Sequence, residues 1–395
     1  MITWLRRNLF RSFWDSILTV LFAVLAIYVI VNLARFIFIT GRWEIIQVNL
    51  KLLLVGRFPE DQMWLVQASV VALAFWIATI ASGVVRKSEE PISLKSRIWD
   101  NVRRFGLLAL LGLVLVALSG GWGAIVFGLL IVAGIVAGNL VGRARRSVTA
   151  IARIPWLLWQ FVLMLIPLSL IVLTLRSATL ELWGGFLINF YIAVISIALS
   201  YPLGILLALG RRSTLPVVRY LSTFYIEFLR GSPLFVLLLL AGVALEFFVP
   251  PGVGPDSVTR AITVFTLFTA AYVAEIVRGG LQSIPKGQQE AGTALGLSPT
   301  KVTFLITLPQ ALRNVIPAQI GQFISLFKDT TLAGVALNIF EVLNVGTAIT
   351  KQDDFLGQGL IYESLAFIAL LFWVGSYVMS RESQRLEKRL GVGVR

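Results

Sequence analysis

The chain has 395 residues, of which 57% are hydrophobic and 14% charged, and its mean hydropathy is +0.87. A soluble domain carries about 25% charged residues, so this composition excludes an ordinary soluble protein and indicates repeated membrane-spanning segments. The sequence has no cysteine and no histidine, which excludes disulfides, thiolate chemistry and histidine-ligated metal sites. The net charge is +14, but most of the lysines and arginines fall on one side of the predicted spans. This bias orients the chain with its basic loops in the cytoplasm and does not indicate a nucleic-acid partner.

Hydropathy predicts an all-α integral membrane protein with about ten transmembrane helices and both termini in the cytoplasm. In the N-terminal half the predicted spans are 13–39, 64–85, 105–120, 122–141 and 155–175. The first of these segments is too long for a signal peptide and lacks a small-residue cleavage site, so we expect it to remain as a span. Residues 41–63 are predicted to form a mixed, amphipathic segment on the outer side.

The C-terminal half carries five further apolar segments. Its predicted spans are 183–209, 234–248, 258–277, 311–337 and 358–379. Residues 217–229 are predicted to form an amphipathic helix, either along the membrane surface or leading into the next span. Pro202 and Gly204 favour a kink in the first of these spans. An outer loop near the middle of the chain divides it into 1–181 and 182–395.

The longest polar interruption of the C-terminal half follows the eighth predicted span. Ser283 can cap a short helix over about residues 285–295, and Gly296 supplies the left-handed residue that helix C-termini favour. Ser298 then caps a second helix, with Pro299 in the first turn, where its missing N–H costs nothing. Two short helices joined at a glycine predict a rigid, protruding structure that is presented to a partner.

This interruption, residues 279–310, contains a recognisable motif. Glu290-Ala291-Gly292, then Gly296, then Ile306-Thr307-Leu308-Pro309 resemble the EAA loop in the permease subunits of ABC importers. The resemblance implies a coupling helix that docks on a cytoplasmic ATPase. It assigns the coupling role to Pro285, Glu290, Ala291, Gly292, Gly296, Leu308 and Pro309. The family commonly has alanine where this chain has Gly292, which lowers helix propensity by up to ~1 kcal/mol but leaves a small residue at a packing position. The alternative is a cytoplasmic hairpin without a partner.

Three further stretches narrow the resemblance to the permeases of polar amino acid ABC importers. They are 228–234, 272–280 and 322–332. The resemblance covers roughly residues 182–390 and implies a five-helix permease core of the type I importers. The extra N-terminal spans are similar to those of enlarged permeases of general or of neutral and acidic L-amino acid importers, and they contain no motif with an assignable chemical role.

A charged group, Lys328-Asp329-Thr330-Thr331, lies inside the ninth predicted span. Charges within a span are costly, so a functional site is the default hypothesis. A zwitterionic substrate needs an anion beside its ammonium and a cation beside its carboxylate, and an adjacent lysine and aspartate with two hydroxyls can supply both in a water-lined path. In the structural alternative, Lys328 and Asp329 neutralise each other or neighbouring spans. Asp329→Ala is predicted to impair uptake while the complex still assembles.

Three other charged residues are predicted to have structural roles. Glu275 and Arg278 are three apart on one helical face near the cytoplasmic end of the eighth span and can pair locally. Arg230 precedes a Gly-Ser-Pro sequence and is expected to anchor its span at the membrane surface.

The resemblance implies a non-catalytic transport subunit. The chain has no Gly-x-x-x-x-Gly-Lys-Ser/Thr loop, so it is not the ATPase, and ATP and Mg²⁺ are expected to be bound by partner subunits, with no cofactor or metal on this chain. The implied partners are two cytoplasmic ABC ATPases, a second, paralogous permease, an extracytoplasmic amino acid-binding protein and membrane lipid. The expected location is the bacterial inner membrane.

Two other classes of function are alternatives to the importer. The first is an ATP-independent secondary amino acid transporter or channel, which the absence of an inverted-repeat signature disfavours. The second is an integral-membrane enzyme, for which the sequence offers neither histidine nor cysteine. Copurification of an ATPase separates the importer from both.

Overall fold

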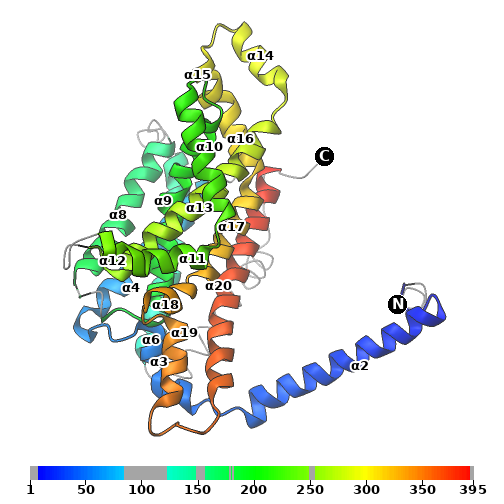
Figure 1. The fold of residues 1–395 in the computed structure, drawn as a ribbon, viewed down its shortest axis with the longest axis vertical. Helices are drawn as coiled ribbons and strands as arrows, with labels where there is room; N and C mark the ends of the chain where they lie inside the picture. The colour runs from blue at the N-terminus through cyan, green and yellow to red at the C-terminus, as the bar shows by residue number, and fades with distance from the viewer. Residues whose placement is uncertain are drawn as a thin grey trace.

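The computed structural model describes residues 8–83, 122–147, 156–177, 179, 182–248 and 254–391. In these ranges the regular elements are helices, and Figure 1 shows an elongated bundle from which α2 extends to one side. Seven of the described helices are long and apolar enough to cross a membrane, or eight if one bent pair counts as a span. The prediction of an all-α membrane protein is confirmed, while the predicted span 105–120 lies outside the described residues.

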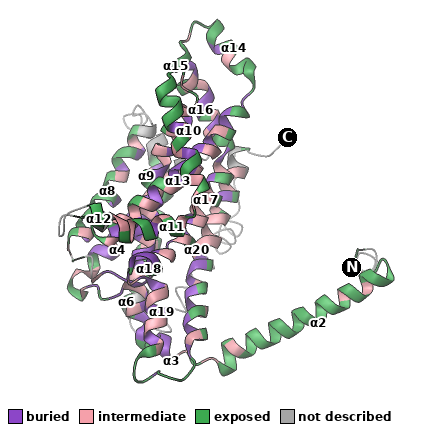
Figure 2. Ribbon diagram, viewed as in Figure 1, coloured by how far each residue is buried: buried purple, intermediate pink, exposed green. Residues whose placement is uncertain are grey.

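The first predicted span is a single exposed helix. α2 (Phe13–Arg35) continues into a π-helical turn, η1 (Phe36–Thr40). The hydroxyl of Ser12 caps α2 by accepting a hydrogen bond from the Asp15 N–H at 3.1 Å. None of its residues is buried, and Figure 2 shows it exposed along its whole length. Its length is sufficient to cross a bilayer unaided.

Three helices of the N-terminal half form a group in which the first packs against each of the other two. They are α4 (Met63–Gly83), α6 (Trp122–Ser147) and α8 (Trp156–Ser177). Gly138 of α6 lies so close to the Phe75 carbonyl of α4 that a Cβ would overlap it, which is the close approach that glycine permits between membrane helices. The Trp76 indole N–H donates to the Gln160 carbonyl at 3.2 Å and ties α4 to α8.

The C-terminal half is built on the parallel pair α9 (Gly185–Arg211) and α13 (Ser257–Gln282). Gly204 of α9 sits directly against Val273 of α13, where a side chain would not fit. α9 passes through Pro202 without a break. The other helices are α10 (Pro216–Gly231), α11 (Leu234–Leu239), η4 (Leu240–Ala244), α12 (Leu245–Phe248), α14 (Lys286–Ala294), α15 (Pro299–Val302), η5 (Thr303–Thr307), α16 (Leu308–Asn314), α17 (Ile316–Asp329), α18 (Leu332–Leu337), α19 (Val342–Ala348), η6 (Ile349–Lys351) and α20 (Ile361–Leu390).

The predicted seventh span, 234–248, is not an independent straight helix. α10 packs lengthwise on α9 and α13, and the α11–η4 segment then leaves it at a bend of 102°. Pro233 causes the break, because proline has no N–H and disfavours a helical residue before it. The segment predicted to be amphipathic, 217–229, lies within α10 and leads into α11 through this bend.

The predicted ninth span, 311–337, is not one continuous helix. It is divided into α16, α17 and α18. Pro317 lies in the first turn of α17, two residues after the non-helical Val315. At the other end, Thr330 and Thr331 turn their hydroxyls back to the carbonyls three residues earlier, at 2.7 and 3.0 Å. Such local side-chain bonds compete with helix continuation.

Segments of the N-terminal half pack against the C-terminal half at two places. Phe58, Trp183 and Tyr191 form successive edge-to-face ring contacts at 5.1 and 5.2 Å, and Tyr191 also hydrogen-bonds Ser69 of α4. Separately, α3 (Glu44–Val55), followed by η2 (Glu60–Gln62), buries one face against α19 and α20. In Figure 1, α14 stands at one end of the bundle and α3 at the opposite end.

Candidate functional site

The protruding loop begins differently from the prediction. Ser283 does not cap α14, whose N-cap position is taken by Pro285 without a side-chain bond. The Ser283 hydroxyl instead donates to the Gly280 carbonyl at 2.8 Å and accepts from the Asn314 amide at 3.1 Å. Ser283 therefore caps the end of α13 and ties it to α16, and residues 283–285 separate α13 from α14.

The end of α14 is a complete Schellman motif. Gly296 has a φ of 78°, its N–H donates to the Thr293 carbonyl at 2.9 Å, and the Leu297 N–H donates to the Gly292 carbonyl at 3.2 Å. The predicted left-handed stop is thus confirmed. Ser298 caps α15 through the Lys301 N–H at 3.5 Å, with Pro299 in the first turn, as predicted.

Gly292 packs α14 against the returning chain. It is buried, and a Cβ at this position would lie 2.9 Å from Ile306 Cδ1 and 3.0 Å from Val302 Cγ2. Both neighbours are ends of side chains that can move slightly. The small residue therefore lets the two arms of the loop close on each other, which explains how the chain accommodates glycine where the family commonly has alanine.

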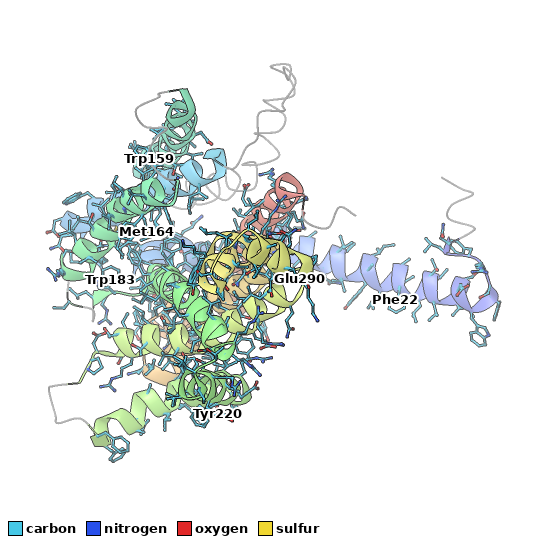
Figure 3. The ribbon with its side chains drawn as sticks, turned by 90° about the horizontal axis from the view of Figure 1, so that it is seen from above. Phe22, Trp159, Met164, Trp183, Tyr220 and Glu290 are labelled. Atoms are coloured by element: carbon cyan, nitrogen blue, oxygen red, sulfur yellow. The ribbon has the colours of Figure 1, made fainter. Side chains whose placement is uncertain are left out.

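The remaining loop residues divide into an inner and an outer set. Leu308 is buried, whereas Pro285, Glu290, Ala291 and Pro309 are exposed. Leu295, at the end of α14, exposes 81% of its surface. Figure 3 looks down on this end and shows Glu290 on the side of the bundle from which α2 extends. The exposed set is a surface available to a partner.

The intramembrane charged group lies halfway along the bundle. The Phe327 ring fills the space beside Gly375, midway along α20. Lys328 is exposed and Asp329 half-buried, and within the described ranges neither side chain forms an ion pair. In the described residues, Lys328 and Asp329 therefore form no salt bridge with each other.

Thr330 belongs to a different set of contacts from Lys328. It is fully buried, and its hydroxyl accepts a hydrogen bond from the Asn189 side-chain amide at 3.2 Å. The same amide donates to the Glu341 carboxylate at 3.2 Å, and the Asn189 oxygen accepts from the Val342 N–H at 3.1 Å. Two further backbone N–H groups in the first turn of α19 donate to Glu341 at 2.9 Å each.

Sequence analysis missed this network of Asn189, Thr330 and Glu341. The available signal was an asparagine inside an apolar span and an acidic residue between two apolar runs. The sequence did not indicate that they meet, because 152 residues separate Asn189 from Glu341.

The predicted pair of Glu275 and Arg278 is present, within a larger ion cluster. The Glu275 carboxylate accepts from Arg278 Nε at 2.9 Å, and Arg211 of α9 and Arg230 of α10 lie 3.4 and 3.6 Å away. Arg230 also lies over the Tyr272 ring at 5.7 Å. These contacts link α9, α10 and α13 close to the start of the protruding loop.

Taken together, a multi-spanning helical body, a rigid helical loop at one end and a polar group at mid-depth define a membrane transport subunit. The family model described as binding-protein-dependent transport system inner membrane component matches residues 200–392. The chain is 34% identical to the permease protein BztC of a glutamate/glutamine/aspartate/asparagine transport system from Rhodobacter capsulatus, covering 98% of this chain and 93% of that protein. It is 45% identical to YhdY, an inner membrane amino-acid ABC transporter permease of Escherichia coli, over 53% of this chain and 57% of that protein. A crystal structure of an amino acid ABC transporter with histidines matches with a TM-score of 0.46 at 26% identity, covering 51% of this chain and 90% of that one.

Because the match to BztC covers nearly the whole of both chains, the chain belongs to the family of binding-protein-dependent transport system inner membrane components. The predicted membership among amino acid ABC permeases is confirmed, and the chain is a multi-pass inner-membrane protein. The match also extends through the N-terminal half, which the family model leaves unmatched.

Proposed function

We propose that this chain is the translocating subunit of an ATP-driven importer of polar L-amino acids, in particular acidic amino acids and their amides. The observation that carries the proposal is the Schellman-terminated helix α14, which presents Glu290 at one extremity of the bundle. The substrate class follows the names of relatives such as BztC. The coupling contact and the substrate path are inferred from the residues of this chain.

The coupling loop is proposed to dock on a cytoplasmic ATPase. Its exposed members, Pro285, Glu290, Ala291 and Pro309, form the contact, while Gly292, Gly296 and Leu308 hold the loop in shape. Two ATPase subunits bind and hydrolyse MgATP, and a second, paralogous permease completes the membrane bundle. The loop and both termini face the cytoplasm, in agreement with the placement of the basic segments.

The substrate path is proposed to pass the end of α17. Lys328 and Asp329 project from the helix at mid-depth without an ion-pair partner in the described residues, so their charges are available to the carboxylate and ammonium of an amino acid. Thr331 lies beside them, whereas Thr330 supports the turn through Asn189. ATP binding shifts the bundle between inward- and outward-facing states, with the coupling loops moving with the ATPases.

The test is amino acid uptake and ATP hydrolysis in proteoliposomes that contain this chain with its copurified ATPase. Glu290→Lys is expected to reduce ATPase recruitment or coupled uptake. Asp61→Lys, a charge reversal at an exposed position near the opposite end, is the matched control and is expected to leave both unchanged. Uptake by the wild type without any ATPase would support the secondary-transporter alternative instead.

A further inference from the structure

The end of the molecule opposite the coupling loop carries a second protruding loop, residues 351–360, between η6 and α20 (Figure 1). Phe355 is buried and anchors this loop in the core formed with α3, α19 and α20. Its neighbour Leu356 points outward and exposes 62% of its surface. Gly357 and Gly359 have φ angles of 75° and 72°, which shape the turn after the exposed leucine.

The loop is held by a helix from the N-terminal half of the chain. Asn49 of α3 and Gln352 exchange two side-chain hydrogen bonds, at 3.1 and 2.9 Å. Eleven residues further on, in the first turn of α20, the Glu363 carboxylate accepts from the N–H of Arg42, which lies just before α3, at 3.1 Å. α3 and the residue that leads into it therefore hold the chain on both sides of the loop, and Leu356 is presented from a rigid support.

The charge of this loop differs from that of the chain as a whole. The chain has a net charge of +14, but the loop places two carboxylates, Asp353 and Asp354, directly before the anchor and the exposed leucine. Both carboxylates are exposed. The exposed Lys351 at the start of the loop leaves it a net charge of −1, and the two aspartates are the charges that stand next to the anchor and Leu356 in the chain. An apolar side chain on a rigid support, bordered by charged groups, has the anatomy of an interface centre with a polar rim.

We propose that loop 351–360, braced by α3, is the docking site for the extracytoplasmic binding protein, which places an apolar pocket over Leu356 and basic side chains opposite Asp353 and Asp354. The inference rests on the proposed function. It commits to this partner because the family depends on a binding protein, because the loop is at the far end from the ATPase contact, and because its acidic rim selects a basic surface. It also gives α3 of the N-terminal half a role in positioning the docking surface.

The experiment measures the dissociation constant between the purified transporter complex in nanodiscs and the binding protein that restores uptake to the wild-type complex. Leu356→Asp and the double variant Asp353→Lys/Asp354→Lys are expected to weaken binding by about tenfold or more. Asn49→Leu removes the brace without altering the loop sequence and is expected to give a smaller weakening. The amount of copurified ATPase reports whether each variant is folded and assembled.

Leu295→Asp is the matched control, because it introduces the same charge at another exposed leucine, on the coupling loop. It is expected to lower ATPase recruitment and to leave the affinity for the binding protein unchanged. Unchanged affinity in Leu356→Asp and in the double aspartate variant would overturn the docking assignment alone. If these variants instead separate the two permease subunits while retaining the binding protein, the loop is a permease–permease contact. Failure of the wild type to take up amino acids with any binding protein would count against the proposed function itself.

Discussion

Asn189 illustrates how one buried amide can fix the geometry of three helices. Its side chain joins α9 to the end of α17 and to the start of α19. Asn189→Leu preserves the volume but leaves Glu341 and the Val342 N–H each short of one partner. We expect the free energy of unfolding to fall by about 2–4 kcal/mol, because each buried polar group left unpaired costs about 1–3 kcal/mol. Thermal unfolding in detergent checks this.

Asn139→Leu provides the comparison for that variant. Among the described residues, the Asn139 amide donates to the Ile135 carbonyl of its own helix, at 3.0 Å, and to no other helix. Its replacement is expected to change the unfolding temperature little. If both variants lower the unfolding temperature equally, the network around Asn189 contributes no more to stability than a hydrogen bond within one helix.

Removal of the Asp329 carboxylate tests the proposed substrate path. Asp329→Ala is expected to lower uptake by about tenfold or more, since a hydrogen bond to a charged group contributes about 1.5–3 kcal/mol. The amount of assembled complex is expected to be unchanged, because the carboxylate has no ion-pair partner in the described residues. Asp61→Ala is the exposed control. Normal uptake by Asp329→Ala would remove the substrate role.

At the scale of a single element, two glycines of the coupling loop are expected to respond oppositely to alanine. Gly296→Ala forces a Cβ into a left-handed conformation and costs about 1–2 kcal/mol locally. Gly287 lies inside α14 with open space around it, so Gly287→Ala raises helix propensity by up to about 1 kcal/mol. Hydrogen exchange of the α14 amides is the measurement, and the same direction of change in both variants would contradict the assigned helix end.

The ion cluster around Glu275 is expected to stabilise the contact between the three helices that meet before the coupling loop. Glu275→Gln removes the carboxylate that Arg211, Arg230 and Arg278 share, and in the described residues Arg211 alone keeps a second partner, Glu227, at 2.8 Å. The Glu275 side chain is only 23% exposed. We expect a loss of about 1–3 kcal/mol of stability, below the value for a fully buried pair because part of the cluster is solvated. Glu60→Gln, which breaks the surface pair with Lys51, is expected to have no measurable effect on the unfolding temperature.

For the whole molecule, α3 is the test of whether the N-terminal half is an integral part of the fold. Ile46→Ala is expected to cost about 2–5 kcal/mol, because its side chain is fully buried against the C-terminal half. Val48→Ala, on the exposed side of the same helix, is expected to stay within about 0.5 kcal/mol. A small effect of Ile46→Ala on thermal stability would mean that α3 is only loosely attached.

The sequence was sufficient to predict features that depend on neighbours in the chain. The long apolar runs of α2 and α9, the left-handed Gly296 and the capping Ser298 are all local, and each was predicted correctly. The division of 311–337 was missed because the hydroxyls of Thr330 and Thr331 compete with a hydropathy signal that favours one long helix.

Features that depend on distant partners were not predictable in this way. The sequence of residues 41–63 indicated an amphipathic segment. It did not indicate that the apolar face of α3 packs near the loop before α20, because the contacting residues Asn49 and Gln352 are 303 positions apart in the chain. The coupling residues were identifiable only through the family motif, because Glu290 and Ala291 have no local feature that distinguishes them from other exposed helical residues.

The position of α3 has a consequence for biosynthesis. α3 is made early, while α19 and α20, which cover part of its apolar face, are made last, and at about 5–20 residues per second the 303 residues between Asn49 and Gln352 take roughly 15–60 s to translate. During that interval α9 is made and packs against α3, but the part of the α3 surface that α19 and α20 cover has no partner. The closing of α19 and α20 onto α3 is therefore a late event in the assembly of the subunit.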